Sequence, residues 1–340
     1  MADGHRMSAR TSTSRTVPAA RQSTATAAHE HPPVSVVVAT REREQLLLRA
    51  LGAIVAQDYP GPIEIIVVRD GDWDEDAVQA LTTTMTPQLG ARATLTQTPN
   101  ARSTGLAGGR NTGITAATHD LVAFCDDDDE WLPGKLSAQV PMLLRTPAAS
   151  VVATGISVVH DGVATDRPGP LRPTTFEDLL TRRVMELHPS TFLLRRADLL
   201  GPIGLVDEQL PGGYAEDYDL LLRAAALGPV LSVPRPLVRV HWHGSSFYFS
   251  KWQTIHESLD ALLAKHPQFA QVPRGHARVR GQQALALAAM GRRREALQAA
   301  AQTWRMAPGE PRAYLAAVVA SRLVSIESLQ AQLHKRGRGL

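Results

Sequence analysis

The sequence of 340 residues is poor in cysteine, in aromatic residues and in long hydrophobic runs. Cys125 is the only cysteine, which excludes a disulfide framework and indicates a reducing compartment. No run approaches the roughly 18 apolar residues of a membrane-spanning helix, and the best candidate, Tyr314–Ile326, contains Arg322. Aromatic residues make up 5% and do not alternate with basic residues, so we expect no nucleic-acid partner.

Charge is distributed unevenly along the chain. The net charge is +3, but residues 265–340 carry 13 basic and three acidic side chains, which makes the central region acidic. A basic flank on an acidic body can contact an anionic membrane or an acidic protein. It is equally compatible with an arginine-rich helical surface that contacts only solvent.

Composition divides the chain into three predicted regions. Residues 1–33 are rich in Ser, Thr, Ala and Arg without apolar periodicity, which predicts a disordered tail, and they lack the apolar core of a signal peptide. Residues 34–250 carry the strand and helix patterns described next. Residues 251–340 have a composition typical of helices. Within this C-terminal helical segment, four residues have the relative spacing of a tetratricopeptide-like pair of helices: Ala284, Gly291, Ala296 and Pro308.

Short apolar runs alternate with amphipathic segments from residue 34 onward. Val34–Ala39 is β-branched and almost wholly apolar, as is typical of a strand buried on both faces. Glu44–Gln57 places its apolar residues on one side of a helix. The alternation continues with predicted strands at Ile63–Val68, Ala93–Thr96 and Leu121–Cys125 and helices near Asp76–Met85 and Leu106–Ala117. Such units are parallel and right-handed, so the sequence predicts an α/β sheet with helices on both faces.

Polar residues follow three of the predicted strands at their carboxyl ends, where ligands bind in such sheets. They are Thr40-Arg41, Asp70-Gly71 and the acidic run Asp126–Asp129. In an extended segment alternate side chains share a face, so Asp126 and Asp128 point the same way. Two carboxylates on one face attract a hard divalent cation, and a diphosphate can complete its shell. The alternative is a solvated acidic turn that caps the next helix.

Four motifs follow one another in a fixed order: Val34–Thr40, Glu64–Gly71, Gly109–Gly113 and Phe124–Leu136. Together they resemble the nucleotide-binding half of family-two glycosyltransferases of the GT-A fold, whose pattern runs strand-Thr, strand-Asp-Gly, Ala-Arg-Asn-x-Gly and Asp-x-Asp-Asp-x-Trp. The likeness continues through Gly213–Arg223 and covers residues 34 to about 250. It implies the Rossmann-like sheet of nucleotide-diphospho-sugar transferases, followed here by a C-terminal α-helical extension. It also implies transfer of a hexosyl or related sugar, with inversion, from a nucleotide-diphosphate donor such as a UDP-sugar.

The resemblance assigns the donor pocket to residues at the strand ends. Asp70 would accept a hydrogen bond from the uracil imide N–H, unless it only caps the following helix. Arg69 replaces the aspartate that the family often has there, which leaves the nucleobase open. Arg110 would fork onto a base carbonyl or a phosphate, unless it is a surface arginine. Thr40 and Asp127 complete the set, together with Asp126, and Thr40 could equally be a turn residue.

The same resemblance assigns a divalent cation, Mn²⁺ or Mg²⁺, to Asp126, Asp128 and His241. Imidazole suits manganese better than magnesium. His243 would share a strand face with His241, which leaves the choice between them open, and a structural role for either is the alternative.

A Glu-Asp pair at positions 216–217 resembles the segment that opens a helix on the acceptor side of the family's site. The match assigns Asp217 as the general base that deprotonates the acceptor hydroxyl. A helix dipole favours its anionic form, and acids placed at a helix start for that reason alone are the alternative. His188-Pro189-Ser190 is a candidate lining of the acceptor pocket without an assigned role.

The predicted partners are a nucleotide-sugar donor and an acceptor that is a carbohydrate, a lipid-linked molecule or a small molecule. Polysaccharide biosynthesis is the expected process and the cytoplasm the expected location, with peripheral contact at the inner face of a membrane, or with a protein, through the basic C-terminal segment. Two other functions stay open. A non-catalytic scaffold acting through its C-terminal helices would not need the intact acidic motifs. A nucleotidyltransferase normally has a Gly-rich phosphate loop where this chain has Thr40–Arg43.

Overall fold

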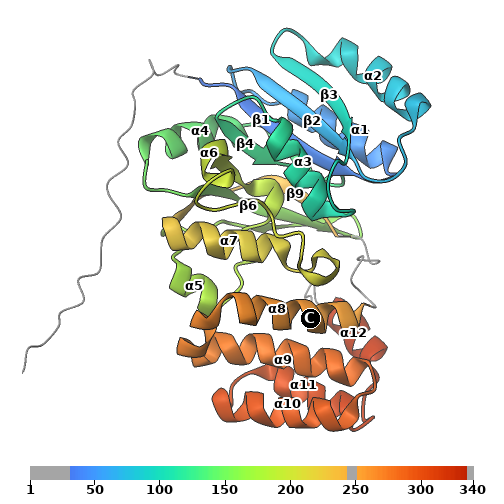
Figure 1. Cartoon of the computed structure of the whole chain (residues 1–340), viewed down its shortest axis with the longest axis vertical. Coiled ribbons are helices and arrows are strands. Elements are labelled where there is room, and N and C mark those ends of the chain that lie inside the picture. Colours follow the sequence, from blue (N-terminus) through green and yellow to red (C-terminus); the bar gives the residue numbers. More distant parts are fainter. Residues whose placement is uncertain (1–30, 243–250, 335–340) are drawn as a thin grey trace, which may run out of the picture. The chain divides into compact units, whose positions relative to one another are not determined.

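The computed structural model describes residues 31–242 and 251–334, and these form a mixed sheet surrounded by helices (Figure 1). Residues 1–30 of the predicted tail lie outside the described residues, and so does His243. The strands are β1 (Val34–Thr40), β2 (Ile63–Arg69), β3 (Ala93–Pro99), β4 (Leu121–Phe124), β5 (Glu130–Trp131), β6 (Val151–His160), β7 (Val163–Arg167), β8 (Leu193–Arg195) and β9 (Val230–His241).

The strand order within the described residues is β3-β2-β1-β4-β8-β6-β9-β5, with β7 beside β6. The first four strands in this order are parallel, and β8 then joins β4 and β6 in antiparallel fashion. The predicted parallel half is therefore confirmed, and a mixed half extends it. His241, which the sequence places on a strand, is the last residue of β9.

The helices before residue 230 are α1 (Glu44–Val55), α2 (Glu75–Leu89), α3 (Leu106–Ala116), α4 (Lys135–Arg145), α5 (Phe176–Thr181), α6 (Arg196–Leu199) and α7 (Glu216–Leu227). Those after residue 250 are α8 (Trp252–Lys265), α9 (Pro273–Ala289), α10 (Arg293–Met306), α11 (Pro311–Ala320) and α12 (Ile326–His334). Short 3₁₀ helices cover Pro189–Thr191, Pro211–Gly213 and Pro267–Gln271. None of the helices in the described residues is both long and apolar enough to cross a membrane.

Helices cover both faces of the sheet, as the sequence predicts. All seven residues of β1 are buried. Val36 and Val38 belong to the apolar cluster that contains Leu47 of α1, whereas Val37 belongs to the cluster that contains Ile114 of α3. Because successive side chains of a strand point to opposite faces, a strand buried on both must be apolar throughout, which explains the uninterrupted run.

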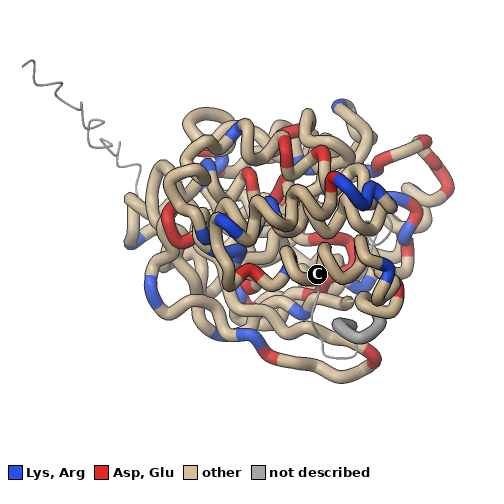
Figure 2. The backbone as a smooth tube through the Cα atoms, turned by 90° about the horizontal axis from the view of Figure 1, so that it is seen from below, with Lys and Arg blue, Asp and Glu red and all other residues tan. Residues whose placement is uncertain are grey.

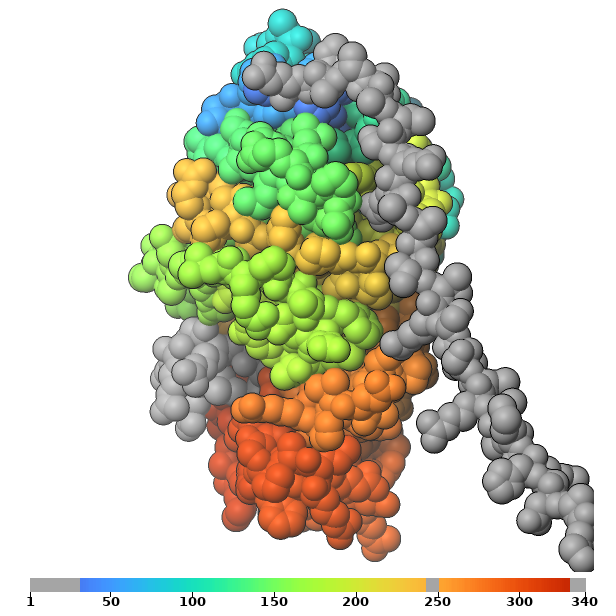
Figure 3. All heavy atoms as spheres, turned by 90° about the vertical axis from the view of Figure 1, so that its left-hand side faces the viewer, coloured from blue at the N-terminus to red at the C-terminus, as the bar shows by residue number. Residues whose placement is uncertain are grey.

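The C-terminal helices continue the apolar cluster of one sheet face. Leu262 of α8 and Val279 of α9 are buried in the same cluster as Leu180 of α5. A Cβ on Gly275 would come within 1.8 Å of the Leu180 carbonyl oxygen, so α9 lies directly against the end of α5 (Figures 1 and 3). Seen from the side of these helices, Lys and Arg positions are interspersed with Asp and Glu positions (Figure 2). A domain boundary near residue 250 stays a prediction.

Candidate active site

The acidic run forms a loop after β4 that Ser190 holds in place. The Asp126 N–H donates to the Ser190 hydroxyl at 3.0 Å, and this hydroxyl donates to Asp129 Oδ2 at 2.5 Å. Trp131 Nε1 donates to the Ser190 carbonyl at 3.0 Å, and Lys135 Nζ lies 3.8 Å from the centroid of the Trp131 ring. The Trp and Lys of the motif therefore form the buried support of this loop. The helix cap alternative is wrong, because Gly134 precedes α4 and no side chain caps that helix.

Arg110 joins the acidic loop to the start of α7. Its guanidinium donates to Asp126 Oδ1 at 2.6 Å and to Glu216 Oε1 at 2.7 Å, and its side chain is only 3% exposed. The surface-arginine alternative is therefore wrong. The motif glycine explains how α3 brings Arg110 so close to the strands: a Cβ on Gly113 would lie 2.2 Å from Val37 Cγ1. Because one guanidinium contacts both carboxylates, the acidic loop and the start of α7 lie at one site.

The start of α7 places two neighbouring carboxyl groups in different electrostatic surroundings. Ala215, just before it, has a left-handed φ of 66°. Burial above all, followed by the nearby Asp217 and Asp126, raises the pKa of Glu216 to about 7, although Arg110 acts in the opposite direction. Burial also acts to raise the pKa of Asp217, but Arg183 above all, followed by Arg110 and His188, lowers it below its ordinary value. Arg183 donates to Asp217 Oδ2 at 2.7 Å. Asp217 is therefore held as a carboxylate, the form that a general base needs.

Thr40 and Asp127 contact each other at the ends of β1 and β4. The Thr40 hydroxyl donates to Asp127 Oδ2 at 2.7 Å. Arg43 donates to Asp127 Oδ1 at 3.3 Å and to Asp128 Oδ2 at 3.1 Å. Burial raises the pKa of Asp127 to about 6, although Thr40 and Arg43 act in the opposite direction. Thr40 is thus buried in the site and is not a turn residue at the surface.

Asp70 lies at the end of β2 and accepts two hydrogen bonds from a neighbouring loop. The Asn100 amide donates to Oδ1 at 2.7 Å, and the Gly105 N–H donates to Oδ2 at 3.0 Å. Asp74 caps α2 instead, so the capping alternative for Asp70 is wrong. Arg69 points away from this loop and pairs with Glu44 at 2.6 Å. The arginine at this position, where the family often has an aspartate, therefore serves an ion pair with α1.

Three potential metal ligands already lie together at the acidic loop. Asp126, Asp129 and His188 each offer an atom within 4.8 Å of the others. Burial lowers the pKa of His188, which favours the neutral imidazole that can bind a metal. The group shares Asp126 with the predicted metal site but includes neither Asp128 nor His241. His241 Nε2 lies 2.5 Å from Glu130 Oε1, and Asp128 faces Arg43.

Several contributors to the site were not assigned from the sequence, among them Arg43, Arg183, His188 and Ser190. His188 and Ser190 belong to a segment that the sequence associates only with the acceptor pocket. Arg183 lies after α5 in no motif, and its contact with Asp217 becomes visible only in three dimensions. Arg43 follows the first strand by three residues, a position from which a basic side chain can reach the next strand end but for which residue type alone gives no partner.

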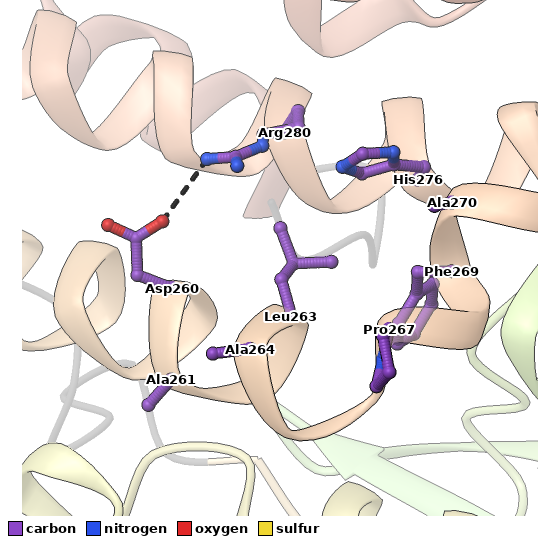
Figure 4. A pocket seen from close by; sticks show the side chains of 9 residues that line it. All are labelled: Asp260, Ala261, Leu263, Ala264, Pro267, Phe269, Ala270, His276 and Arg280. Atoms are coloured by element: carbon purple, nitrogen blue, oxygen red, sulfur yellow. Dashed lines mark hydrogen bonds and ion pairs between the residues drawn. The ribbon is translucent and has the colours of Figure 1, made fainter.

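A cavity of about 640 Å³ lies elsewhere, between α8 and α9 (Figure 4). Its lining is mostly apolar, with Arg280 donating to Asp260 at 3.1 Å and His276 nearby. It contains no predicted site residue and gives no indication of chemistry.

Comparisons with known proteins agree with the geometry. The family model for glycosyl transferase family 2 matches residues 35–201. The amylovoran biosynthesis glycosyltransferase AmsB of Erwinia amylovora is 24% identical over 248 residues, which are 70% of this chain and 79% of that protein. The putative colanic acid biosynthesis glycosyl transferase WcaA of Escherichia coli is 31% identical over 107 residues, which are 32% and 36% of the two chains.

Solved structures show the same fold. Residues 1–349 of TarS from S. aureus, in complex with UDP-GlcNAc, align with a TM-score of 0.57 at 17% identity and cover 90% of this chain and 92% of theirs. The mannosyltransferase PcManGT from Pyrobaculum calidifontis, in complex with GDP-Man and Mn²⁺, aligns with a TM-score of 0.55 at 20% identity, over 88% and 82% of the two chains. The predicted GT-A fold is confirmed. The chain belongs to glycosyl transferase family 2 and is an enzyme that transfers sugars.

Proposed function

We propose that the enzyme transfers a sugar from a nucleotide-diphosphate donor to an acceptor hydroxyl with inversion, by a single displacement. The observation that carries the proposal is the double contact of Arg110 with Asp126 and Glu216, at 2.6 and 2.7 Å. This contact supports the proposal because it joins the loop that we propose binds the donor to the helix that carries the proposed base. A scaffold without catalysis would not need a base carboxylate kept ionised beside this loop.

Asp217 acts on the acceptor. Its carboxylate takes the proton of the acceptor hydroxyl while that oxygen forms a bond to the anomeric carbon. On the opposite face the bond from the anomeric carbon to the diphosphate oxygen breaks, and the nucleotide diphosphate leaves with the electron pair. Attack from the face opposite the leaving group inverts the configuration. Arg110 remains beside the leaving group, where its fixed positive charge opposes the negative charge that develops there.

The acidic loop fits a divalent cation, since it combines carboxylates with a neutral imidazole. A bound Mn²⁺ or Mg²⁺ would neutralise charge on the departing diphosphate. Asp126 belongs to both candidate ligand sets. For the second carboxylate we favour Asp128, whose side chain is 25% exposed, over Asp129, which is 2% exposed, because a cation that also contacts a donor needs a ligand open to the site. His241 is proposed as the histidine ligand and His188 as the competing one.

The donor is proposed to be a UDP-sugar. Asp70, oriented by Asn100 and Gly105, presents carboxylate lone pairs at the end of β2, where an imide N–H can donate to them. TarS with UDP-GlcNAc supports uracil, whereas PcManGT with GDP-Man and Mn²⁺ supports the metal and a different base. The names of AmsB and WcaA support polysaccharide biosynthesis as the process. A cytoplasmic location fits the single buried free thiol, Cys125.

A thermal-shift screen of nucleotide sugars, with and without Mn²⁺, tests the proposal. A ligand present at 100 times its dissociation constant stabilises the folded state by about 2.7 kcal/mol. We expect UDP-sugars to raise the melting temperature, and Mn²⁺ to increase that shift. A screen in which no nucleotide sugar stabilises the protein, with or without metal, would contradict the proposed function.

A further inference from the structure

Arg183 connects the proposed base, Asp217, to other cationic side chains. One end of its guanidinium pairs with Asp217 at 2.7 Å, and its Cζ lies 5.7 Å from the centroid of the Tyr218 ring. Arg278 of α9 approaches the same ring, at 5.5 Å, and donates to the Tyr218 hydroxyl at 2.8 Å. Two arginines from segments almost 100 residues apart therefore gather around one tyrosine next to the base.

Arg278 is a cation without a counter-charge. Among the described residues its hydrogen-bond partner is the neutral Tyr218 hydroxyl, and no carboxylate pairs with it. Its Nε is buried with no hydrogen-bond partner. Burial lowers the pKa of Arg278, Tyr218 acts in the opposite direction, and Arg312 and Arg183 lower it further. Arg183 lies over the same Tyr218 ring as Arg278, and a Cβ on Gly281 of α9 would lie 3.0 Å from the Cβ of Arg312, so Arg312 packs against the helix that carries Arg278. A partly buried cation surrounded by like charges is unfavourable unless an anion joins it.

Arg312, at the start of α11, supplies the third cation. It pairs with Glu310 at 2.9 Å, but its Nε is also buried with no partner. The Arg183 and Arg312 side chains are 33% and 27% exposed, so solvent and solutes can reach them. Asp217 and Glu310 balance only two of the three positive charges.

We propose that Arg183, Arg278 and Arg312 form an anion subsite on the acceptor side, which binds a phosphate group of the acceptor. Guanidinium groups from three separate segments suit a tetrahedral oxyanion, which accepts hydrogen bonds from several directions, better than a planar carboxylate, which engages one fork. A phosphate held there leaves a hydroxyl of the adjoining sugar near Asp217. This inference rests on the proposed function, because it specifies the acceptor of the same site.

Inorganic phosphate is the first probe. Binding to the full chain is measured by calorimetry in EDTA, with chloride at equal ionic strength as the reference. We expect saturable binding that is weakened roughly tenfold or more in Arg278→Gln, is partly kept in Arg278→Lys, and is unchanged in Arg274→Gln, an exposed position on the same helix. Melting temperatures of all variants verify that they fold. No saturable binding, or equal binding by wild type and Arg278→Gln, would overturn the proposal.

A second experiment distinguishes a soluble phosphate acceptor from a lipid-linked one. Wild type and Arg278→Gln are sedimented with phosphatidylcholine vesicles with and without polyprenyl phosphate. Arg278-dependent sedimentation supports a lipid-linked acceptor, and phosphate binding without sedimentation supports a soluble one. The donor side is tested separately, because hydrolysis of a nucleotide sugar does not need the subsite. If the wild type hydrolyses a nucleotide sugar but does not bind phosphate, the anion subsite is wrong and the proposed function stands. If the wild type hydrolyses no nucleotide sugar, the proposed function itself is wrong.

Discussion

The proposed donor side and the proposed acceptor side of the site are built in different ways. The proposed donor residues follow the ends of three adjacent parallel strands, β2, β1 and β4, so the sheet itself brings them together. The acceptor residues come from the segment after α5, the start of α7 and, in our proposal, helices α9 and α11. Sheet register fixes the first group, whereas tertiary packing of helices fixes the second.

The two sides also differ in charge balance. On the donor side, burial raises the pKa of Asp127 to about 6, and burial with the neighbouring Asp126 and Asp128 raises that of Asp129 well above its ordinary value. On the acceptor side, Arg183 lowers the pKa of Asp217. Burial therefore disfavours the charged forms of Asp127 and Asp129, an effect that a bound cation would oppose, whereas Arg183 already favours the charged form of the proposed base. This comparison implies that a bound metal ion favours the charged carboxylates of the proposed donor side and leaves the ionisation of Asp217 unchanged.

The largest effect is expected for Asp217→Asn. Removing the general base should lower turnover on the order of 10²–10⁴-fold while donor affinity changes little, because the amide cannot accept the proton. Steady-state turnover and nucleotide-sugar affinity are the two measurements. Asp166→Asn, at an exposed position, serves as the control. Unchanged turnover in Asp217→Asn would remove this residue from the base role.

The next effect distinguishes Asp128 from Asp129 as the second carboxylate ligand of the metal. Asp128→Ala should weaken Mn²⁺ affinity roughly 100-fold, because it removes a direct ligand, whereas Asp129→Ala should weaken it by about tenfold through loss of support. Asp129→Ala should instead lower the melting temperature more, since Asp129 is buried and accepts from Ser190. Calorimetric titration with Mn²⁺ measures both affinities. The reverse order would assign the metal to Asp126, Asp129 and His188.

A third change tests how the C-terminal helices are joined to α7. Asp219 is fully buried and accepts from Arg223, Lys265 and His266 at 2.8–2.9 Å. Asp219→Ala should destabilise the protein by about 3 kcal/mol, because it leaves these donors without their anion. Urea unfolding measures the loss, with Asp166→Ala, at an exposed position, as control. A change below about 0.5 kcal/mol would show that this network does not stabilise the junction.

The same residue predicts a pH dependence of stability. The pKa of Asp219 falls from an ordinary 3.8 to about 2 in the folded state. Because the folded pKa is depressed, the stabilisation is fully present above about pH 4 and is lost as the pH falls towards 2. The acid limb of the unfolding free energy should therefore flatten in Asp219→Ala.

The smallest effect is expected for Arg183→Gln. Losing the cation that lowers the pKa of Asp217 should raise that pKa, so the acid limb of the turnover–pH profile should move to higher pH. At low pH turnover should fall about tenfold for each pKa unit of this displacement. Arg183→Lys should restore most of the profile. An unmoved acid limb would show that Arg183 does not control the ionisation of Asp217.

Much of the parallel half of the sheet was predictable from the sequence, because buried parallel strands must be apolar throughout. Strand and helix ends moved by a few residues: the predicted helix Glu44–Gln57 ends at Val55, and the one near Asp76–Met85 extends to Leu89. β8 could not be predicted from periodicity, since it has only three residues and pairs with strands distant in the chain. The antiparallel half depends on such pairings.

The site was predictable where a motif marks a strand end and not elsewhere. Thr40, Asp70 and Asp126 all lie where the strand pattern places them. Ser190 and His188 contact the acidic loop from a position about 60 residues later, and only the path of the intervening chain brings them there. Arg183 and Arg278 depend on helix packing in the same way. Their assigned roles stay predictions.

One measurement tests most directly whether both sides act on a single pair of substrates. It is the release of nucleoside diphosphate from UDP-sugars by the wild-type enzyme with Mn²⁺, by the wild type in EDTA, and by Asp217→Asn with Mn²⁺, each with acceptor present. The account predicts fast release only in the first case. Equal release in all three would contradict a site in which the acidic loop and Asp217 work together.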